Sequence, residues 1–286
     1  IKVCKPASEY QLNGDQKIIK ENTKWKWHYS PEERPFNQII EEFTEIFEKT
    51  IIDCTYKRSI LLPISSGLDS RTLVIPIHKR KDLTLASYDF EGGFPESKTG
   101  KVLSKQFNIP YYTQKIQRGY LWKKLDEISN LNNCMTDFIH PRQIDAIHHW
   151  QGLGDVILLG HWGDVLFDKH AESDKINYDE QLIHLKENIL KPGGRELADD
   201  LWKIWNLEGS FETYITERLD RLYSDIDIDH PSARMRAFKS LYWAPRWTSV
   251  NLSIFNQAGE IVLPYYSDAM CKFICTVPER YLEGRR

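Results

Sequence analysis

The sequence predicts an α/β fold in which a parallel sheet is flanked by helices and is followed by a helical C-terminal part. Up to about residue 170, short apolar runs alternate with segments of helical periodicity, the pattern of parallel strands joined by crossover helices. From about residue 179 onward the strand-like runs stop and only helix-like segments follow. We therefore expect a lead-in segment (1–35), an α/β domain (36–175) and a helical region (176–286) that packs on it as one continuous domain.

The first elements follow directly from residue spacing. Residues 1–35 are polar without a clear period, which indicates short strands or loops. Apolar residues recur at helical spacing in 36–52 and predict an amphipathic helix. The run RSILLPI (58–64) is almost wholly apolar, as in a parallel strand covered on both faces. The next segment (69–80) has a helical pattern, and Pro76 should kink or shorten that helix.

The rest of the chain continues the same alternation. Further strands are predicted at 83–90, 108–116 and 155–160, and helices at 96–107, 121–131, 142–154, 179–190, 195–205, 211–223 and 233–243. The acidic stretch SDIDIDH (224–230) lacks the full spacing and the glycine of a calcium-binding loop, so it is interpreted as a solvated loop.

Composition narrows the class of protein. The 286-residue chain has a net charge of −3 and a pI near 6.3, so no overall basic field indicates a nucleic-acid partner. No apolar stretch reaches the length of a membrane span. An odd number of cysteines without a C-x-x-C pair favours a reducing, cytoplasmic setting over a disulfide framework. Because the chain runs from Ile1 to Arg286, we expect one or both ends to continue beyond it. The cysteines are Cys4, Cys54, Cys134, Cys271 and Cys275.

The junction SSGLDS follows the first strand of the predicted sheet. Ligands of open parallel sheets bind at the carboxyl ends of strands, and small residues let the backbone approach them closely. Unpaired N–H groups at the start of a helix, together with the hydroxyls of Ser65, Ser66 and Ser70, favour an anion. The carboxylate of Asp69 suits such a site if a divalent cation such as magnesium lies between it and a phosphate. An ordinary Ser/Asp helix cap is the alternative interpretation.

The same stretch resembles the pyrophosphate-binding loop S-G-G-x-D-S of the asparagine synthetase family, which belongs to the wider group of ATP pyrophosphatases with an adenine-nucleotide α-hydrolase-like fold. Ser66 stands where the family has its first glycine, and a positive φ at that position would be strained. The resemblance implies that ATP and its pyrophosphate are bound by Ser65, Ser66, Gly67, Leu68, Asp69 and Ser70.

A second segment, LLGHWGDVLFD (158–168), resembles the family pattern G-E-G-x-D-E-x-F. Gly160, Asp164 and Phe167 match the pattern, whereas Val165 replaces the acidic residue after the aspartate. The resemblance implies that Asp164 binds magnesium together with Asp69. A loop-capping role is the alternative for Asp164.

His161 replaces the glutamate that asparagine-forming members of the family use in catalysis. This departure argues against asparagine formation as such. A neutral histidine can accept a proton from an incoming amine near pH 7, so His161 is the candidate catalytic base. The alternative is that His161 only packs or contacts solvent.

Two further segments support the resemblance. Residues 95–112 are similar to the helix after the second strand, with Glu96 near an acidic position of the family. Residues 244–268 are similar to the late segment of the family, an arginine followed by E-x-R-x-P-F. Arg246, Glu260 and Pro264 match that segment, whereas Val262 stands in place of its arginine.

The resemblance implies an AMP-forming amide-bond synthetase that uses ATP and Mg²⁺. Its substrates would be a small-molecule or peptide carboxylate and an amine donor, with neither nucleic acid nor membrane as partner. A glutaminase domain or partner is expected upstream if one exists, and the family's late lysine is expected beyond Arg286. Adenine is expected near five residues, for which core packing is the alternative: Leu62, Ile64, Ser87, Tyr88 and Gly160.

Two other functions stay open. A non-catalytic descendant that binds nucleotide or a protein partner would explain the altered residues of the motifs. An ATP pyrophosphatase that modifies tRNA would need a basic face and often paired cysteines, and the sequence has neither.

Overall fold

A computed structural model describes residues 3–15, 17–168, 170–171 and 175–283 of the chain. The chain divides into two compact units. Unit 1 comprises Ile1–Glu32, Asp168–Trp243 and Cys275–Arg286, and unit 2 comprises Glu33–Phe167 and Ala244–Ile274. Both units are therefore discontinuous in sequence, which differs from the predicted boundaries at 35/36 and 175/176.

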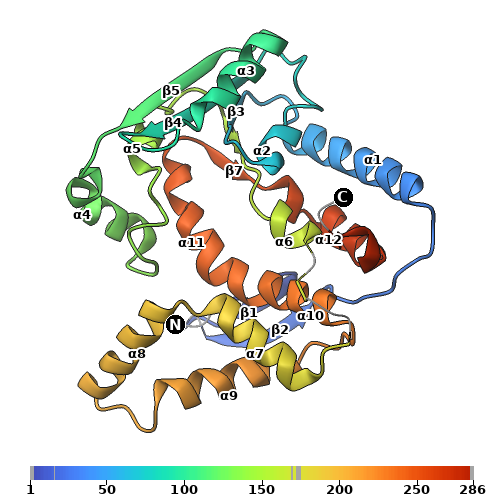
Figure 1. Ribbon diagram of the computed structural model, residues 1–286, viewed down its shortest axis with the longest axis vertical. Helices are drawn as coiled ribbons and strands as arrows, with labels where there is room; N and C mark the ends of the chain where they lie inside the picture. Colours follow the sequence, from blue (N-terminus) through green and yellow to red (C-terminus); the bar gives the residue numbers. More distant parts are fainter. Residues whose placement is uncertain (1–2, 16, 169, 172–174, 284–286) are drawn as a thin grey trace. The chain divides into compact units, whose positions relative to one another are not determined.

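Unit 2 is built on a five-stranded sheet in the order β5-β4-β3-β6-β7, with every neighbouring pair parallel (Figure 1). This arrangement confirms an α/β unit with a parallel sheet flanked by helices. The strands are β3 (Ile60–Pro63), β4 (Leu83–Phe90), β5 (Tyr111–Ile116), β6 (Val156–Leu158) and β7 (Glu260–Val262).

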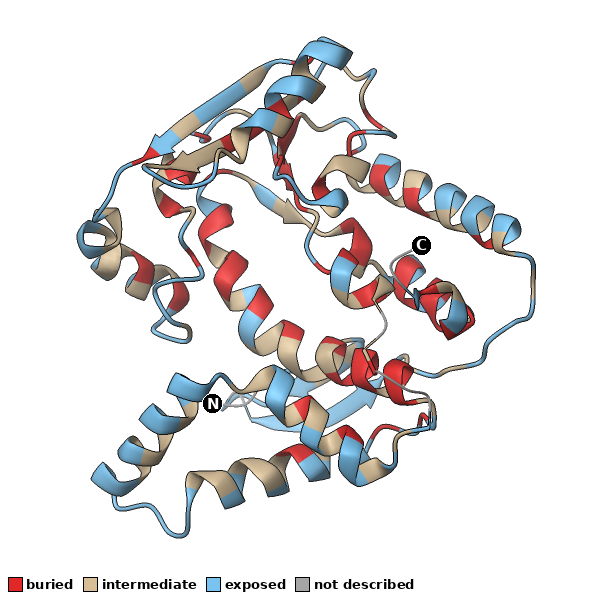
Figure 2. Cartoon of the chain, viewed as in Figure 1, coloured by how far each residue is buried: buried red, intermediate tan, exposed pale blue. Residues whose placement is uncertain are grey.

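The central strands are buried because their residues are apolar on both faces. Every residue of β6 and the first three of β3 are buried, as Figure 2 shows in red. Ile60 lies opposite Leu83 of β4 on one side and Val156 of β6 on the other, so β3 is the middle strand. The four strands expected from the sequence are present. The prediction that no strand follows residue 179 was wrong, because β7 pairs with β6.

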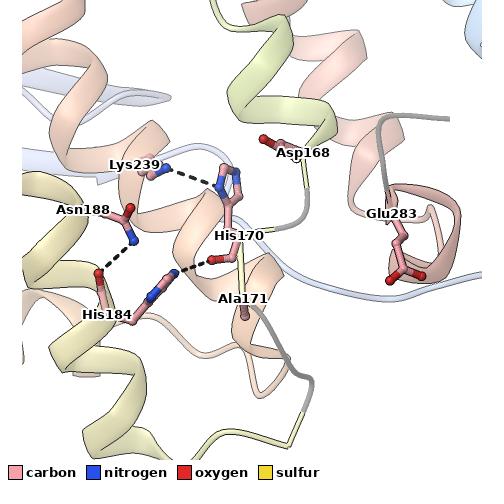
Figure 3. Close-up of a pocket in the computed structure, with 7 residues that line it drawn as sticks. All are labelled: Asp168, His170, Ala171, His184, Asn188, Lys239 and Glu283. Atoms are coloured by element: carbon pink, nitrogen blue, oxygen red, sulfur yellow. Dashed lines mark hydrogen bonds between the residues drawn. The ribbon is translucent and has the colours of Figure 1, made fainter.

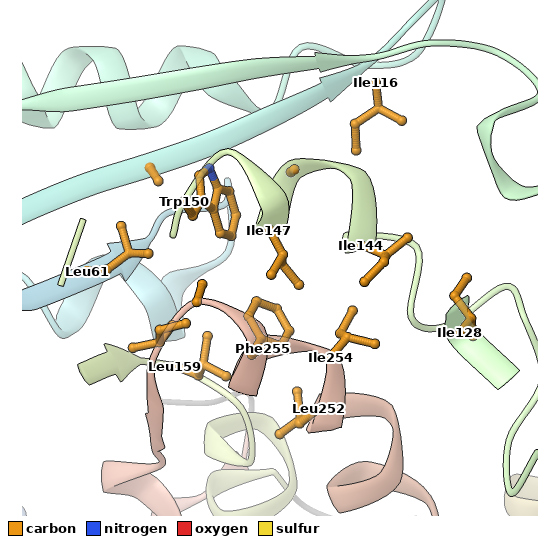
Figure 4. Packing of buried hydrophobic residues seen from close by; sticks show 14 residues of the cluster. Leu61, Ile116, Ile128, Ile144, Ile147, Trp150, Leu159, Leu252, Ile254 and Phe255 are labelled. Atoms are coloured by element: carbon orange, nitrogen blue, oxygen red, sulfur yellow. The ribbon is translucent and has the colours of Figure 1, made fainter. Parts of the chain in front are cut away.

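Alternate residues of the strands face two different helical layers. On one face, the buried side chains of Leu61, Ala86 and Ile157 pack with Trp150 and Phe255 (Figure 4). On the other face, α3 approaches so closely that a Cβ on Gly100 would lie 2.8 Å from the hydroxyl of Ser87. The period of two along β4 therefore assigns Ala86 and Ser87 to opposite faces.

The helices expected in unit 2 are present, although two of them are shorter than predicted. The segment 69–80 forms a helix only at its start, since turns with i to i+3 hydrogen bonds replace the helix around Pro76. The segment 142–154 is helical over five residues. The helices are α1 (Phe36–Cys54), α2 (Leu68–Thr72), α3 (Ser97–Phe107), α4 (Tyr120–Asn132), α5 (Ile144–His148), α6 (Gly163–Phe167), α11 (Ser249–Leu252) and α12 (Asp268–Ile274), with 3₁₀ turns η2 (Ser253–Gln257) and η3 (Pro264–Tyr266). Of these helices, α6, α11 and α12 were not predicted.

Unit 1 combines an antiparallel strand pair with helices. The strands β1 (Ser8–Leu12) and β2 (Ile18–Thr23) confirm short strands in the lead-in segment. The helices are α7 (Tyr178–Ile189), α8 (Pro192–Ile204), α9 (Phe211–Ser224) and α10 (Pro231–Phe238), with the 3₁₀ turn η4 (Glu279–Tyr281). A π-helical segment, η1 (Lys239–Thr248), follows α10.

The core of unit 1 contains a buried ion pair. Arg236 and Glu279 are each no more than 3% exposed and meet through two hydrogen bonds of 2.5 and 3.0 Å. In the acidic stretch before α10, Ile226 and Ile228 are buried, whereas the aspartates between and beside them are exposed. This alternation agrees with a solvated loop that is anchored by its two isoleucines.

No helix in the described part of the chain is both long and apolar enough to cross a membrane.

Candidate functional site

The candidate site lies where the direction of the strand order reverses. The chain runs from β3 outward to β4 and β5 on one side, and then returns to β6 on the other side of β3. The segments after β3 and β6 therefore leave adjacent carboxyl ends in different directions, and a crevice at such a switch point is where open α/β sheets bind ligands. The loop 64–67 and the segment 159–162 follow these two strand ends.

The loop after β3 is shaped by two of its serines. The hydroxyl of Ser70 accepts a hydrogen bond from the backbone N–H of Ser65 at 3.1 Å and lies 3.1 Å from the hydroxyl of Ser65. The N–H of Gly67 donates to the Ser65 hydroxyl at 3.2 Å. Ser70 is buried, so its hydroxyl holds the loop from the protein side. The exposed hydrogen-bond donors of the loop belong to Ser65, Ser66 and Gly67.

Ser66 fits the loop although the family pattern has glycine at this position. Ser66 is not among the residues with positive φ, and Gly67 has a φ of −71°. The predicted strain is therefore absent. Both the N–H and the hydroxyl of Ser66 donate to Oε2 of Glu96, each at 3.1 Å. Glu96, which the sequence only suggested as a supporting residue, thus contacts the loop directly.

Two glycines allow the segment after β6 to approach this loop. A Cβ on Gly160 would lie 2.8 Å from the backbone nitrogen of Ser70. A Cβ on Gly163 would lie 2.8 Å from Cγ and 2.9 Å from Oδ1 of Asp69. Because the atoms at Gly160 are backbone, only glycine permits the observed distance there, whereas a Cβ on Gly163 would displace the side chain of Asp69. The sequence predicts a site role for Gly160 but gives no signal for Gly163, whose place in the family pattern is variable.

The two predicted magnesium ligands come from these adjoining segments. The carboxylate of Asp69 lies against Gly163, and the next residue along the chain is Asp164, which is exposed. Within the described residues, no third histidine, cysteine or acidic side chain completes a metal-binding group. Two carboxylates without further protein ligands fit Mg²⁺, which keeps several waters and takes phosphate oxygens as its other ligands.

His161 is an exposed residue of the otherwise mostly buried segment between β6 and Asp164. Surrounding protein atoms displace water from the imidazole, and this desolvation lowers the pKa of His161 below its ordinary value of 6.5, while the charge of Asp164 opposes the change. Part of the ring remains exposed, so water limits the effect. His161 is therefore neutral at pH 7 and able to accept a proton.

The residue after His161 has an unusual backbone. Trp162 is buried and has a φ of 81°, in the left-handed region that bulky residues rarely adopt. Its ring packs against Tyr266 at 5.2 Å between centroids. The family pattern has glycine at this position, and this is the signal by which the sequence could have predicted the conformation. Strain of this kind is maintained by its surroundings and is common beside functional sites.

Tyr265 was missed by the sequence analysis and joins the late segment to the loop. Pro264 begins the turn η3, and the hydroxyl of Tyr265 donates to the backbone oxygen of Asp69 at 3.3 Å. Burial raises the pKa of Tyr265, and the charge of Asp69 acts in the same direction.

Two further residues of the late segment, Glu260, which matches the family pattern, and Val262, which departs from it, lie in the sheet. Glu260 at the start of β7 binds Arg58 through a salt bridge of 2.7 Å. Val262 pairs with Leu158 of β6. Part of the segment that resembles the family pattern therefore forms β7, the fifth strand of the sheet.

The residues expected near adenine are mostly enclosed by protein. Leu62, Ile64 and Ser87 are buried, and the hydroxyl of Ser87 donates to the backbone oxygen of Ile64 at 2.7 Å. Tyr88 is partly buried, packs against Phe90 at 5.4 Å between ring centroids, and has its pKa raised by burial. Of these four side chains, only that of Tyr88 offers appreciable surface to a ligand, and the adenine site stays a prediction.

Unit 1 contains a separate polar cavity of about 330 Å³ that the sequence did not predict (Figure 3). The ammonium of Lys239 lies 3.3 Å from Nδ1 of His170, and Nε2 of His184 lies 3.0 Å from the backbone oxygen of His170. Asp168 and Glu283 contribute carboxylates to the same cavity. These residues come from segments far apart in sequence, so no local pattern could have indicated the cavity.

No protein-family model matches this sequence, and no curated protein matches it either.

Proposed function

We propose that the chain is an ATP-dependent, AMP-forming amide-bond synthetase that adenylates a carboxylate substrate. The observation that carries the proposal is the meeting of the SSGLDS loop with the segment after β6, where Gly160 lies against the backbone of Ser70 and Gly163, the residue before Asp164, lies against the carboxylate of Asp69. A Cβ on Gly160 would meet the backbone of Ser70, a Cβ on Gly163 would meet the side chain of Asp69, and both glycines lie at the switch point of the sheet, where α/β folds bind ligands.

The loop would hold the departing pyrophosphate. Ser65 and Ser66 are exposed, and the backbone N–H and hydroxyl of Ser66 already donate to one anion, the carboxylate of Glu96. The contribution expected from a helix dipole is small, because α2 has five residues instead of the predicted twelve. Hydrogen bonds rather than a macrodipole therefore support this assignment.

Asp69 and Asp164 would hold Mg²⁺, which supplies charge neutralisation at the phosphates when bound. The carboxylate substrate attacks the α-phosphorus of ATP, and pyrophosphate leaves with its negative charge stabilised by the donors of the loop. An amine then attacks the acyl-adenylate and releases AMP as the amide forms. His161, whose pKa is lowered by desolvation, would accept the proton that the amine loses.

The substrate differs from aspartate on this proposal, since His161 stands where asparagine-forming relatives have glutamate. A small-molecule or peptide carboxylate and an amine donor are the proposed partners, and an upstream glutaminase domain or partner would supply ammonia if the donor is glutamine. A cytoplasmic location fits the ATP requirement.

A non-catalytic nucleotide-binding protein is the second candidate. The hydrogen bonds from Ser66 to Glu96 favour it, because a donor pair expected to bind phosphate is engaged with a carboxylate of the chain itself.

ATP–pyrophosphate exchange with a panel of carboxylates separates the two candidates. The proposed enzyme catalyses exchange with at least one carboxylate and converts ATP to AMP and pyrophosphate, and Asp69→Ala abolishes both reactions. Asp53→Ala, which changes an exposed residue at the end of α1, is the control and should retain them. Magnesium-dependent binding of ATP without exchange supports the second candidate, and formation of ADP and phosphate contradicts both.

A further inference from the structure

We propose that Glu96 is an internal anion that closes the SSGLDS loop, and that a phosphate group enters the loop only by displacing its carboxylate. This inference rests on the proposed function, because it assigns the loop to phosphate binding. The carboxylate Oε2 of Glu96 accepts two hydrogen bonds from one residue, the N–H and the hydroxyl of Ser66, at 3.1 Å each.

The arrangement at Ser66 is one that suits a phosphate oxygen. A backbone N–H and a hydroxyl that converge on one oxygen form charge-assisted hydrogen bonds with any anion. The carboxylate of Glu96 already accepts both of them. A phosphate oxygen at the same place would lie beside that carboxylate, and two negative charges at such a distance repel each other. The two anions therefore exclude each other.

The helix that begins beside Glu96 does not depend on this carboxylate. The N–H of Ser97, at the first position of α3, donates to Oδ1 of Asp89 at 2.9 Å. The backbone oxygen of Ser97 accepts from the hydroxyl of Tyr111 at 2.8 Å. Asp89 thus caps α3, while the side chain of Glu96 extends away from its own helix to a residue 30 positions earlier. The contact belongs to the loop rather than to the helix.

The departure from the family pattern at Ser66 has a physical role on this view. Glycine at this position would supply only the backbone N–H to Glu96. The serine hydroxyl adds the second hydrogen bond. Ser66 and Glu96 therefore form a coupled pair, and the serine strengthens the closed state that a phosphate has to open.

Glu96 does not complete the carboxylate pair at the metal site. In the described part of the chain, no group of three acidic, histidine or cysteine side chains is close enough to hold a metal ion. The carboxylate of Glu96 thus competes with phosphate at Ser66 and does not act as a third ligand beside Asp69 and Asp164.

The closed loop lowers the apparent affinity for phosphate in proportion to the fraction of molecules that are open. Removing the charge of Glu96 should raise the affinity for pyrophosphate about tenfold, because one charged acceptor with two hydrogen bonds no longer competes. Ser66→Gly weakens the closed state but also removes a donor to the ligand, so it should raise the affinity less than Glu96→Gln does.

The test is calorimetric titration of the whole chain with pyrophosphate, with and without Mg²⁺, for the parent, Glu96→Gln, Ser66→Gly and the double variant. We expect Glu96→Gln to bind about tenfold more tightly than the parent. In the double variant, Ser66→Gly should no longer increase the affinity, because Glu96→Gln has already removed the charge that makes the closed state strong. Glu91→Gln removes a carboxylate that accepts from the N–H of Arg118 instead of the loop, and should change the affinity less than about twofold.

Glu96→Asp provides a second variant in which the charge is kept but the side chain is too short to reach Ser66, and it should also bind more tightly than the parent. Circular dichroism establishes that each variant is folded. Equal or weaker binding by Glu96→Gln, while the parent binds pyrophosphate, would overturn the displacement model and leave the proposed function standing. Absence of pyrophosphate and ATP binding in the parent and all variants would overturn both.

Discussion

In unit 2 the central strands are apolar and the charged side chains lie beyond the strand ends, whereas unit 1 encloses an arginine and a glutamate within its core. Among the described residues, Arg236 and Glu279 are the only charged side chains that are buried, and both belong to unit 1. Asp69 and Asp164 of unit 2 keep contact with solvent. The buried charges of unit 1 therefore bind each other inside the core, whereas the accessible carboxylates of unit 2 are available to a ligand.

The difference follows from what each unit has to bury. A parallel sheet satisfies its backbone within the sheet and needs only apolar side chains on its two faces. Unit 1 lacks such a sheet, and Arg236 donates both to Glu279 and, at 3.2 Å, to the backbone oxygen of Asp168. The ion pair thus acts as a polar link in a core made mostly of helices.

The largest expected effect comes from breaking this link. Glu279→Gln should lower the free energy of unfolding by about 3–5 kcal/mol, because it leaves Arg236 buried without a balancing charge. Chemical denaturation monitored by circular dichroism measures the change. In unit 2, Asp53→Asn breaks the exposed salt bridge with Lys49 and should cost less than about 1 kcal/mol.

A double variant makes the first prediction sharper. Arg236→Met together with Glu279→Leu removes both charges and should recover most of the lost stability, because neither charge is then left unpaired. If the double variant is as unstable as Glu279→Gln, the role of the pair is in packing rather than in charge balance.

The next prediction concerns the rate of amide formation at His161 of unit 2, and the substitution should leave the free energy of unfolding unchanged. His161→Gln should slow amide formation by about 10²-fold or more, which corresponds to about 2.7 kcal/mol, while pyrophosphate exchange continues. Because the pKa of His161 is lowered, the imidazole becomes protonated only below pH 6.5, so the rate for the parent should fall on the acid side of that value. The pH profile of His161→Gln should lack this fall. An unchanged rate in the variant would make His161 a packing residue.

A smaller effect tests the close approach of the two strand-end segments. Gly160→Ala places a Cβ 2.8 Å from the backbone nitrogen of Ser70, and the loop has to shift. We expect a loss of about 1–3 kcal/mol in stability, typical of overpacking, together with weaker binding of ATP by calorimetry. Normal binding in a stable variant would show that the loop and the segment after β6 move independently.

The smallest expected effect is a gain in stability when a glycine of unit 1 is replaced by alanine, the opposite of the loss expected at Gly160. Gly194 lies in α8, is exposed, and has no heavy atom near the position of an added Cβ. Gly194→Ala should raise the free energy of unfolding by about 0.5–1 kcal/mol, because alanine is favoured over glycine inside a helix. Thermal denaturation measures the change. A loss of stability would indicate a contact at α8 that the structure does not contain.

Local chemistry was enough to predict most of the elements. The apolar run before Ser65 identified β3, helical spacing identified α1, and Pro76 explained why α2 is short. The Ser65–Ser70 loop could also be selected as a candidate anion site, because its serines, glycine and aspartate are adjacent in sequence.

Only the tertiary structure decided which distant residues meet. The three residues of β7 include two β-branched ones, but so short a run predicts no strand by itself, and it becomes a strand by forming hydrogen bonds with β6 at the sheet edge. Residues far apart in sequence make the contacts of Tyr265 with Asp69 and of Glu96 with Ser66. The sequence by itself determined local conformation through side-chain periodicity and turn chemistry; the division into units and the approach of the two strand ends depend on packing between distant segments, which no local pattern encodes.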